Sequence, residues 1–84
     1  MAIKTDGKVR YTVPQKLTAV ADTSVYFRVA DVYRDAKIVV RDGDNIIISK
    51  KKQKLAPAEM EKVELKADVI AALSGEGLSF AIEF

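Results

Sequence analysis

Residues 25–30 of this chain read VYFRVA, and they show the strand pattern of the chain most clearly. Beginning at Val25, every second side chain is apolar, and polar or small residues stand between the apolar ones. Because successive side chains of a strand point to opposite faces, this alternation predicts a half-buried β-strand. We expect Phe27 to face the core, and Tyr26 and Arg28 to lie on the exposed face.

The same alternation recurs along the chain. It predicts further strands over residues 8–13, 37–42, 46–53, 60–66 and 78–84. The 10 Val and 7 Ile residues outnumber the 5 Leu residues, and β-branched side chains suit a pleated sheet better than a helix. Residues 42–45 (DGDN) predict a tight hairpin turn, because Gly, Asn and Asp tolerate positive φ. Near residue 70 we expect one short helical turn, capped by Asp68 and ended by Gly75.

Strands at this spacing, without helices between them, predict an all-β protein. We expect a small antiparallel β-sandwich, immunoglobulin-like, with six to seven strands and one short helical turn. A small barrel of the OB or SH3 type is the alternative. Residues 1–7 are expected to be a flexible leader, since Ile3 is their only large apolar residue besides Met1. Residues 8–84 would then form a single domain.

The composition excludes several classes of chemistry. The 84 residues include no His, Cys or Trp, so a near-neutral imidazole base, a thiolate nucleophile and soft metal ligands are all missing. The glycines match neither a dinucleotide-binding fingerprint nor a phosphate-binding loop. We therefore expect no catalytic, cofactor-binding or metal-binding residue. The longest apolar run, residues 69–73, is too short to cross a bilayer, so no membrane association is expected.

The basic charge of the chain is concentrated in one strip. Lys50, Lys51, Lys52 and Lys54 lie within five residues, and the rest of the chain has 10 basic and 12 acidic residues. Lysines on an exposed strand prevent edge-to-edge pairing of sheets, which is the simplest interpretation. Protein docking and nucleic-acid binding are the alternatives. Nucleic acid ranks lowest because no aromatic residue stands between Tyr33 and Phe80 in the sequence.

Two exposed strands are candidate contact surfaces for a protein partner. The first bears Tyr26 and Arg28, and tyrosine and arginine are enriched at protein interfaces. The second is the strip from Val39 to Arg41, in which an exposed Val39 would form a local apolar patch. The candidate interaction residues are therefore Tyr26, Arg28, Val39, Arg41, Lys50, Lys51, Lys52 and Lys54.

Four segments resemble a known protein family. They are residues 10–16 (RYTVPQK), 25–29 (VYFRV), 38–43 (IVVRDG) and 56–62 (APAEMEK). Together they resemble the C-terminal domain of bacterial FAD-dependent pyridine nucleotide-disulfide oxidoreductases. The resemblance covers nearly all of the chain after residue 7.

The resemblance implies a non-catalytic accessory domain of a cytoplasmic flavoprotein. Such a domain would pack against the FAD- and NAD(P)-binding domains of its parent chain, or mediate assembly with another subunit or a second copy. FAD and NAD(P) are implied for the parent oxidoreductase only. The family's dinucleotide-binding glycines and redox cysteines have no counterpart here, so no cofactor-binding residue is carried over. A small nucleic-acid-binding module that uses residues 50–54 is the alternative function.

Overall fold

The computed structural model describes residues 2–17, 20–74 and 77–84. Within these ranges the chain forms seven strands and one short helix. The elements are β1 (Ile3–Thr5), β2 (Val9–Val13), β3 (Thr23–Val29), β4 (Tyr33–Asp42), β5 (Asn45–Leu55), β6 (Glu61–Leu65), α1 (Ala67–Ala71) and β7 (Leu78–Glu83).

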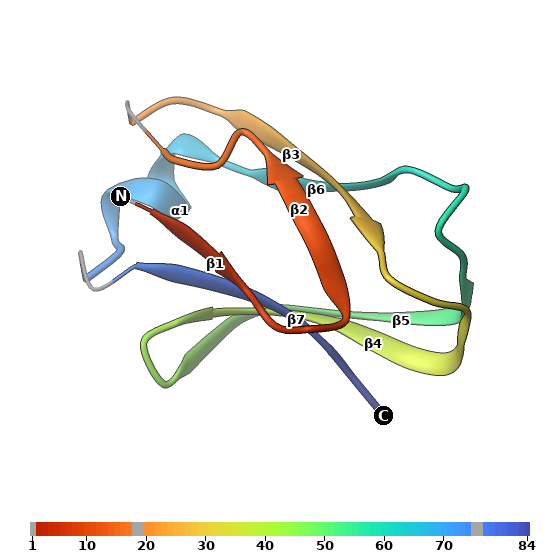
Figure 1. The fold of residues 1–84 in the computed structure, drawn as a ribbon. Helices are drawn as coiled ribbons and strands as arrows, with labels where there is room; N and C mark the ends of the chain where they lie inside the picture. The colour runs from red at the N-terminus through yellow and green to blue at the C-terminus, as the bar shows by residue number, and fades with distance from the viewer. Residues whose placement is uncertain (1, 18–19, 75–76) are drawn as a thin grey trace.

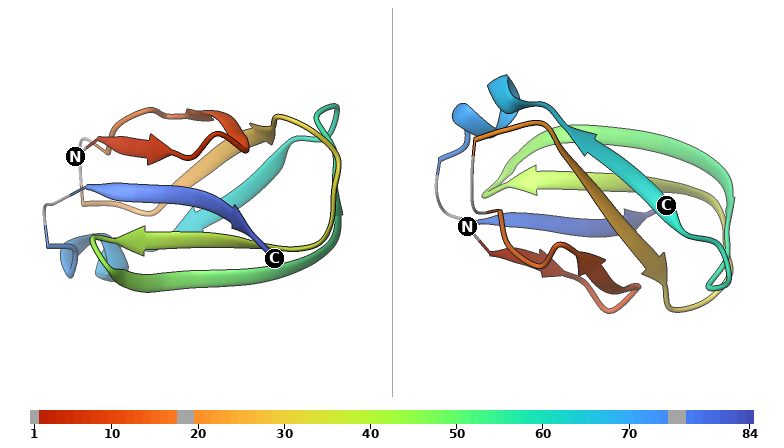
Figure 2. Two further views of the ribbon diagram at one scale, coloured as in Figure 1. Left: turned by 60° about the horizontal axis from the view of Figure 1, so that its bottom comes forward. Right: turned by 90° about the horizontal axis from the view of Figure 1, so that it is seen from above.

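The strands form two sheets that lie face to face (Figure 1). One sheet has three strands in the order β2-β3-β6, and the other has four in the order β1-β7-β4-β5. All neighbours are antiparallel except β1 and β7, which run parallel. The expectation of an all-β sandwich is confirmed. Figure 2 shows the two layers from other sides, with α1 at one end of the sandwich.

The alternation in the sequence places the core between the sheets. Val25, Phe27 and Val29 of β3 are fully buried, as are Leu78 and Phe80 of β7. The rings of Phe27 and Phe80 meet edge to face, with centroids 5.8 Å apart and an interplanar angle of 70°. This is the favourable geometry for two aromatic quadrupoles. The two strands with the clearest sequence pattern thus supply the centre of the core.

The strand pairing follows the immunoglobulin-like plan at its centre. The pairs β3–β6 and β4–β7 correspond to strands B–E and C–F of such sandwiches, and β5 extends the second sheet as strand C′ does. The position beside β7, where a final antiparallel strand would lie, is occupied by β1. The parallel strand β1 therefore forms one edge of the four-stranded sheet.

The structure differs from the expectation that residues 1–7 form a leader outside the domain. Ile3 pairs with Leu78, and the Leu78 amide donates to the carbonyl of Ala2 at 3.2 Å. Asp6 fixes the turn after β1. Its carboxylate accepts hydrogen bonds from the amides of Lys8 (2.9 Å), Val9 (3.1 Å) and Ile82 (3.2 Å). The prediction relied on the lack of large apolar side chains in this segment. The segment is instead held in the domain by backbone hydrogen bonds and by one carboxylate.

The predicted hairpin is present between β4 and β5. Its turn consists of Gly43 and Asp44, and Gly43 has a φ of 59°, which glycine adopts without steric cost. Asp42, the last residue of β4, is buried. Its carboxylate accepts from the backbone N–H (2.9 Å) and hydroxyl (2.7 Å) of Ser74. These bonds join the hairpin end of the sheet to the segment after α1.

The short helix is present, but its cap differs from the prediction. Lys66 occupies the N-cap position and makes no side-chain capping bond, whereas Asp68 lies inside the first turn. The Ala67 amide instead donates to the carboxylate of Asp22, from the segment before β3, at 2.7 Å. The expected end at Gly75 lies outside the described residues. A carboxylate from a distant segment thus replaces the local cap.

Candidate protein-docking surface

The outer side of the three-stranded sheet carries a row of exposed aromatic and aliphatic side chains. Val13 of β2 is paired with Tyr26 of β3, and Tyr11 is paired with Arg28. Val13 is 52% exposed, Tyr26 40% and Tyr11 39%. We call the surface formed by Tyr11, Val13, Tyr26 and Arg28 the tyrosine face. Tyr26 and Arg28 were predicted from the sequence, and Tyr11 and Val13 are added by the structure.

A β-bulge explains why Tyr11 belongs to this face. The pairing of β2 with β3 shifts between Val9 and Tyr11. Val9 is therefore buried, whereas Tyr11 and Val13 are exposed and Thr12 lies between the sheets. Simple alternation places Val9, Tyr11 and Val13 on one face, so it misses this change. The buried Thr12 hydroxyl is satisfied because it donates to the carbonyl of Pro14 at 2.8 Å.

Arg28 is held in place at the edge of the tyrosine face. Its Nη1 donates to the carbonyl oxygens of Pro57 (3.3 Å) and Ala58 (3.4 Å), which belong to the connection between β5 and β6. A guanidinium has five N–H donors, so these bonds leave further donors for a partner. The side chain is thus oriented before any partner arrives, which lowers the entropy lost on binding.

A row of alternating charges borders the tyrosine face along β6. Lys62, the strand partner of Tyr26, lies 3.2 Å from Glu64, and Glu64 lies 3.7 Å from Lys66. Lys66 in turn lies 4.0 Å from Asp22. The hydrogen bond from Lys62, together with the positive charges of Lys62 and Lys66, lowers the pKa of Glu64. Glu64 therefore keeps its negative charge at neutral pH.

This arrangement of side chains is typical of a protein–protein interface. Tyrosine and arginine are the residues that most often carry binding energy, and a polar border commonly surrounds them. Tyr11, Val13 and Tyr26 come from neighbouring strands of one sheet, so they form a continuous exposed surface. The tyrosine face can therefore bind a protein surface through apolar and hydrogen-bonding contacts together.

The second predicted surface, around Val39, is not exposed. Val39 is only 2% exposed, so the prediction of an apolar patch there was wrong. The reason is its position in the sheet: β4 has neighbours on both sides, with Ser49 of β5 and Ala81 of β7 opposite Val39. The longer side chains of Lys37 and Arg41 stand two residues away on the same face of β4. A central strand with long neighbouring side chains leaves little of a valine open to solvent.

Arg41, the other residue of this strip, is already paired within the molecule. Its guanidinium forms an ion pair with the carboxylate of Glu83 on β7. The hydrogen bond from Arg41, with its positive charge and that of Lys37, lowers the pKa of Glu83. The same hydrogen bond raises the pKa of Arg41. Both side chains are partly exposed, so solvent screens this pair and its contribution to stability is small.

The four predicted lysines share one edge strand but not one surface. All of them belong to β5, at the edge of the four-stranded sheet. Lys50 stands opposite Ile38 and lines a shallow opening between β5 and β6 together with Lys62. Lys51 stands opposite Lys37, on the other side of the sheet. Lys54 is exposed.

Lys52 forms an ion pair that reaches from this strip to the second sheet. Its Nζ lies 3.3 Å from the carboxylate of Glu61, a buried residue at the start of β6. A buried carboxylate needs a compensating charge, which Lys52 supplies. The ion pair of Lys52 with Glu61 therefore links β5 of the four-stranded sheet to β6 of the other sheet. Lys50 and Lys51 lie on opposite sides of the four-stranded sheet, so the lysines do not form one surface.

Over residues 2–17, 20–74 and 77–84, no group of three or more acidic, histidine or cysteine side chains could hold a metal ion. The same part of the chain contains no helix with the length and apolar character needed to span a bilayer.

Comparison of the chain with protein-family models, curated proteins and solved structures finds no match.

Proposed function

We propose that this chain is a non-catalytic accessory domain of a bacterial, cytoplasmic FAD-dependent pyridine nucleotide-disulfide oxidoreductase. In this proposal the domain follows the catalytic domains in the parent chain and binds them through the tyrosine face. FAD and NAD(P) would be bound by the catalytic domains and not by this one.

One observation carries the proposal: three of the four segments that resemble the family meet at the tyrosine face. Residues 10–16 supply Tyr11 and Val13, residues 25–29 supply Tyr26 and Arg28, and residues 56–62 supply the carbonyl groups that hold Arg28. Figure 1 shows β2, β3 and β6 side by side in the upper sheet. The fourth segment, residues 38–43, lies in β4 and the turn after it, in the other sheet.

The local chemistry also favours docking over catalysis. The tyrosine face presents aromatic, aliphatic and guanidinium groups, which bind protein surfaces by apolar contact and hydrogen bonding. Its charged border consists of ion pairs within the domain. These groups supply recognition and orientation, whereas general acid–base or nucleophilic chemistry needs a positioned group of tuned pKa.

A binding experiment tests the proposal. The 84-residue chain is immobilised, and the catalytic remainder of the flavoenzyme from the same organism is passed over it. We expect retention, and we expect the double variant Tyr11→Ala/Tyr26→Ala to weaken it more than about tenfold, since buried tyrosines dominate many interfaces. Phe84→Ala is the matched control, because it removes an exposed aromatic ring from the other sheet. Equal binding by both variants, or no retention of the flavoenzyme, would refute the proposal.

Two further measurements separate this proposal from its rivals. Adding FAD to the isolated chain should leave the flavin absorbance spectrum unchanged, whereas a catalytic flavin domain would perturb it. Sedimentation of the isolated chain should show a monomer, whereas a second copy seated on the tyrosine face would give a dimer that Tyr26→Ala disrupts. A perturbed flavin spectrum would contradict the non-catalytic assignment, and a dimer that Tyr26→Ala disrupts would assign the tyrosine face to self-association.

A further inference from the structure

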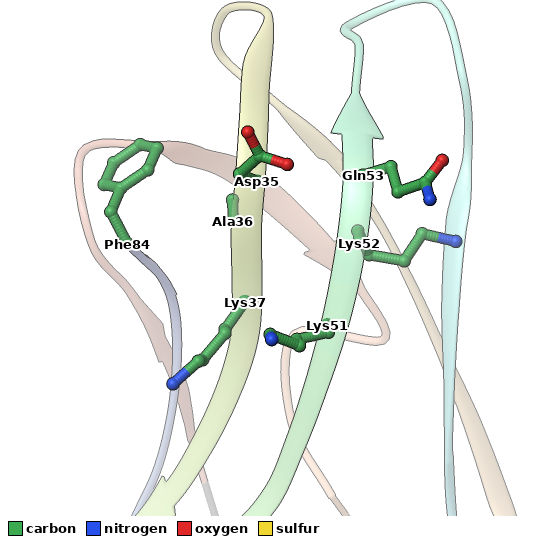
Figure 3. A pocket seen from close by; sticks show the side chains of 7 residues that line it. All are labelled: Asp35, Ala36, Lys37, Lys51, Lys52, Gln53 and Phe84. Atoms are coloured by element: carbon green, nitrogen blue, oxygen red, sulfur yellow. The ribbon is translucent and has the colours of Figure 1, made fainter.

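The four-stranded sheet carries an open hollow of about 780 Å³ on the side away from the three-stranded sheet. Figure 3 shows the side chains around it, which come from β4, β5 and the end of β7. Lys37 and Lys51 lie on its floor, Asp35 and Gln53 stand at one end, and Phe84 forms one wall. The hollow is separate from the tyrosine face, so a ligand could bind here whether or not the tyrosine face docks a partner.

Two lysines at the floor of the hollow repel each other. Lys37 and Lys51 are direct partners across β4 and β5, and like charges in this relation destabilise a sheet. Within the part of the chain that the structure describes, neither lysine forms a salt bridge. Glu83 stands opposite Lys37 on the other side, but its carboxylate is bound by Arg41. An anion placed between the two ammonium groups would relieve this repulsion.

Lys52 does not take part in this pair. It reaches toward β6, where it binds Glu61, and Figure 3 shows it on the opposite side of β5 from Lys51. The positive charge at the floor of the hollow therefore comes from Lys37 and Lys51. Two ammonium groups match the charge of one phosphate group.

An exposed aromatic ring lines the same hollow as the two lysines. Phe84 is 71% exposed, although its ring is held edge to face by Tyr33, with centroids 5.8 Å apart. An exposed aromatic ring in a basic hollow can stack a nucleic-acid base. The sequence separates Phe84 from Lys51 by 33 positions, and only the pairing of β7, β4 and β5 brings them together.

We propose that this hollow binds a nucleoside phosphate unit. The phosphate lies between Lys37 and Lys51, and the base stacks on Phe84. The Asp35 carboxylate, at the end of the hollow, accepts a hydrogen bond from a sugar hydroxyl or a base amino group. Asp35 has a φ of 52°, a conformation that aspartate tolerates better than most residues and that sets this side chain apart from its strand neighbours. The unit can come from a free nucleotide or from a single-stranded nucleic acid.

A titration followed by amide NMR tests this site. Adenosine monophosphate is added to the 84-residue chain at low ionic strength, with inorganic phosphate and a single-stranded hexadeoxyadenylate in parallel. We expect the largest shifts at Lys37, Lys51 and Phe84, and tighter binding of the nucleotide than of phosphate. If the hexamer binds much more tightly, with an affinity that falls steeply with salt, the source is a nucleic-acid strand; equal affinity points to a free nucleotide.

Matched variants locate the charge and the stacking surface. Lys37→Gln/Lys51→Gln should weaken nucleotide binding about tenfold or more, and Lys16→Gln/Lys66→Gln, which removes the same charge elsewhere, should leave it within about twofold. Phe84→Ala should weaken nucleotide binding about tenfold and leave phosphate binding unchanged. Met60→Ala, which removes an exposed apolar side chain elsewhere, should change neither. The proposal fails if no shifts occur, if both lysine pairs have equal effects, or if Phe84→Ala leaves nucleotide binding intact.

Discussion

Asp6 accepts three backbone hydrogen bonds, and each comes from a different residue. Two of these donors, the amides of Lys8 and Val9, begin the next strand, and the third belongs to Ile82 in the last strand. A carboxylate that comes after a strand and precedes a glycine commonly caps a turn. The pair Asp6-Gly7 is therefore the signal in the sequence that could have shown that this segment belongs to the domain.

Replacing Asp6 by Ala should lower the free energy of unfolding by about 2 kcal/mol. The substitution removes the carboxylate from the amides of Lys8 and Ile82, and leaves the Val9 amide only the Asp6 carbonyl at 3.3 Å. Hydrogen bonds to a charged group are worth about 1.5–3 kcal/mol. Urea denaturation followed by circular dichroism measures the change. Asp44→Ala is the control, because Asp44 is an exposed turn residue whose loss should cost less than about 0.5 kcal/mol. Equal urea midpoints for the two variants would contradict this role of Asp6.

Single residues of the docking surface were predictable where the strand is regular. Tyr26 and Arg28 lie in β3, whose uninterrupted alternation fixes their direction. The exposure of Tyr11 could not be predicted in this way, because it depends on a β-bulge. The bulge arises in the pairing with β3 and leaves no clear local pattern in the sequence. Val39 was predicted wrongly because alternation identifies the face of a sheet but not what covers that face.

At the scale of whole elements, β5 is the least protected strand. It is 11 residues long and lies at the edge of its sheet, so within the described chain one row of its backbone groups has no strand partner. Such an edge invites pairing with another molecule unless charged side chains prevent it. The first half of β5 is rich in isoleucine, and the second half carries the lysines.

Replacing two of these lysines should make the protein self-associate. Lys50→Thr/Lys54→Thr keeps the strand propensity of β5 and removes two charges that deter edge pairing. We expect light scattering and sedimentation to show concentration-dependent oligomers of this variant and a monomer of the parent chain. Lys16→Thr/Lys66→Thr, with the same charge change outside the strands, should remain a monomer. Oligomers from the control pair, or none from the edge variant, would show that the lysines do not guard this edge.

Element types were mostly predictable, whereas several boundaries and β1 were not. The strand predicted over 37–42 begins at Tyr33, and the one predicted over 46–53 ends at Leu55. The six longer strands have enough alternating residues to be recognised from their own sequence. The three residues of β1 are too few to show a period, and their stability depends on parallel pairing with β7 near the other end of the sequence. The hollow near Phe84 could not be predicted for the same reason, because the order of the strands in the sheet, and not the local sequence, brings its residues together.

At the scale of the whole molecule, acid should weaken the fold through two glutamates. The pKa of Glu83 on the four-stranded sheet and that of Glu64 on the three-stranded sheet are both lowered by basic neighbours. A lowered pKa means that the folded state holds the charged form more strongly than the unfolded chain does. The stabilisation is therefore complete above the usual glutamate pKa of about 4.3 and is lost as the pH falls through the lower folded values.

The variant Glu83→Gln should lose less stability between about pH 6 and about pH 3 than the parent chain, because one of these groups no longer titrates. Urea denaturation at a series of pH values measures this difference. NMR titration of the Glu83 carboxyl group should give a midpoint below the usual value, and Arg41→Gln should raise that midpoint. A Glu83 midpoint at the usual value in the parent chain would rule out the effect.

The parallel pairing of β1 with β7 bears on how this chain is made. Ile3 and Leu78 are neighbours in the sheet although 75 positions separate them in the sequence. A ribosome releases the first strand early, yet that strand gains its partner in the sheet only when β7 has left the exit tunnel. Strand β1 therefore stays without its partner while the intervening residues are translated. We expect the pairing of β1 with β7 to be among the final events of folding.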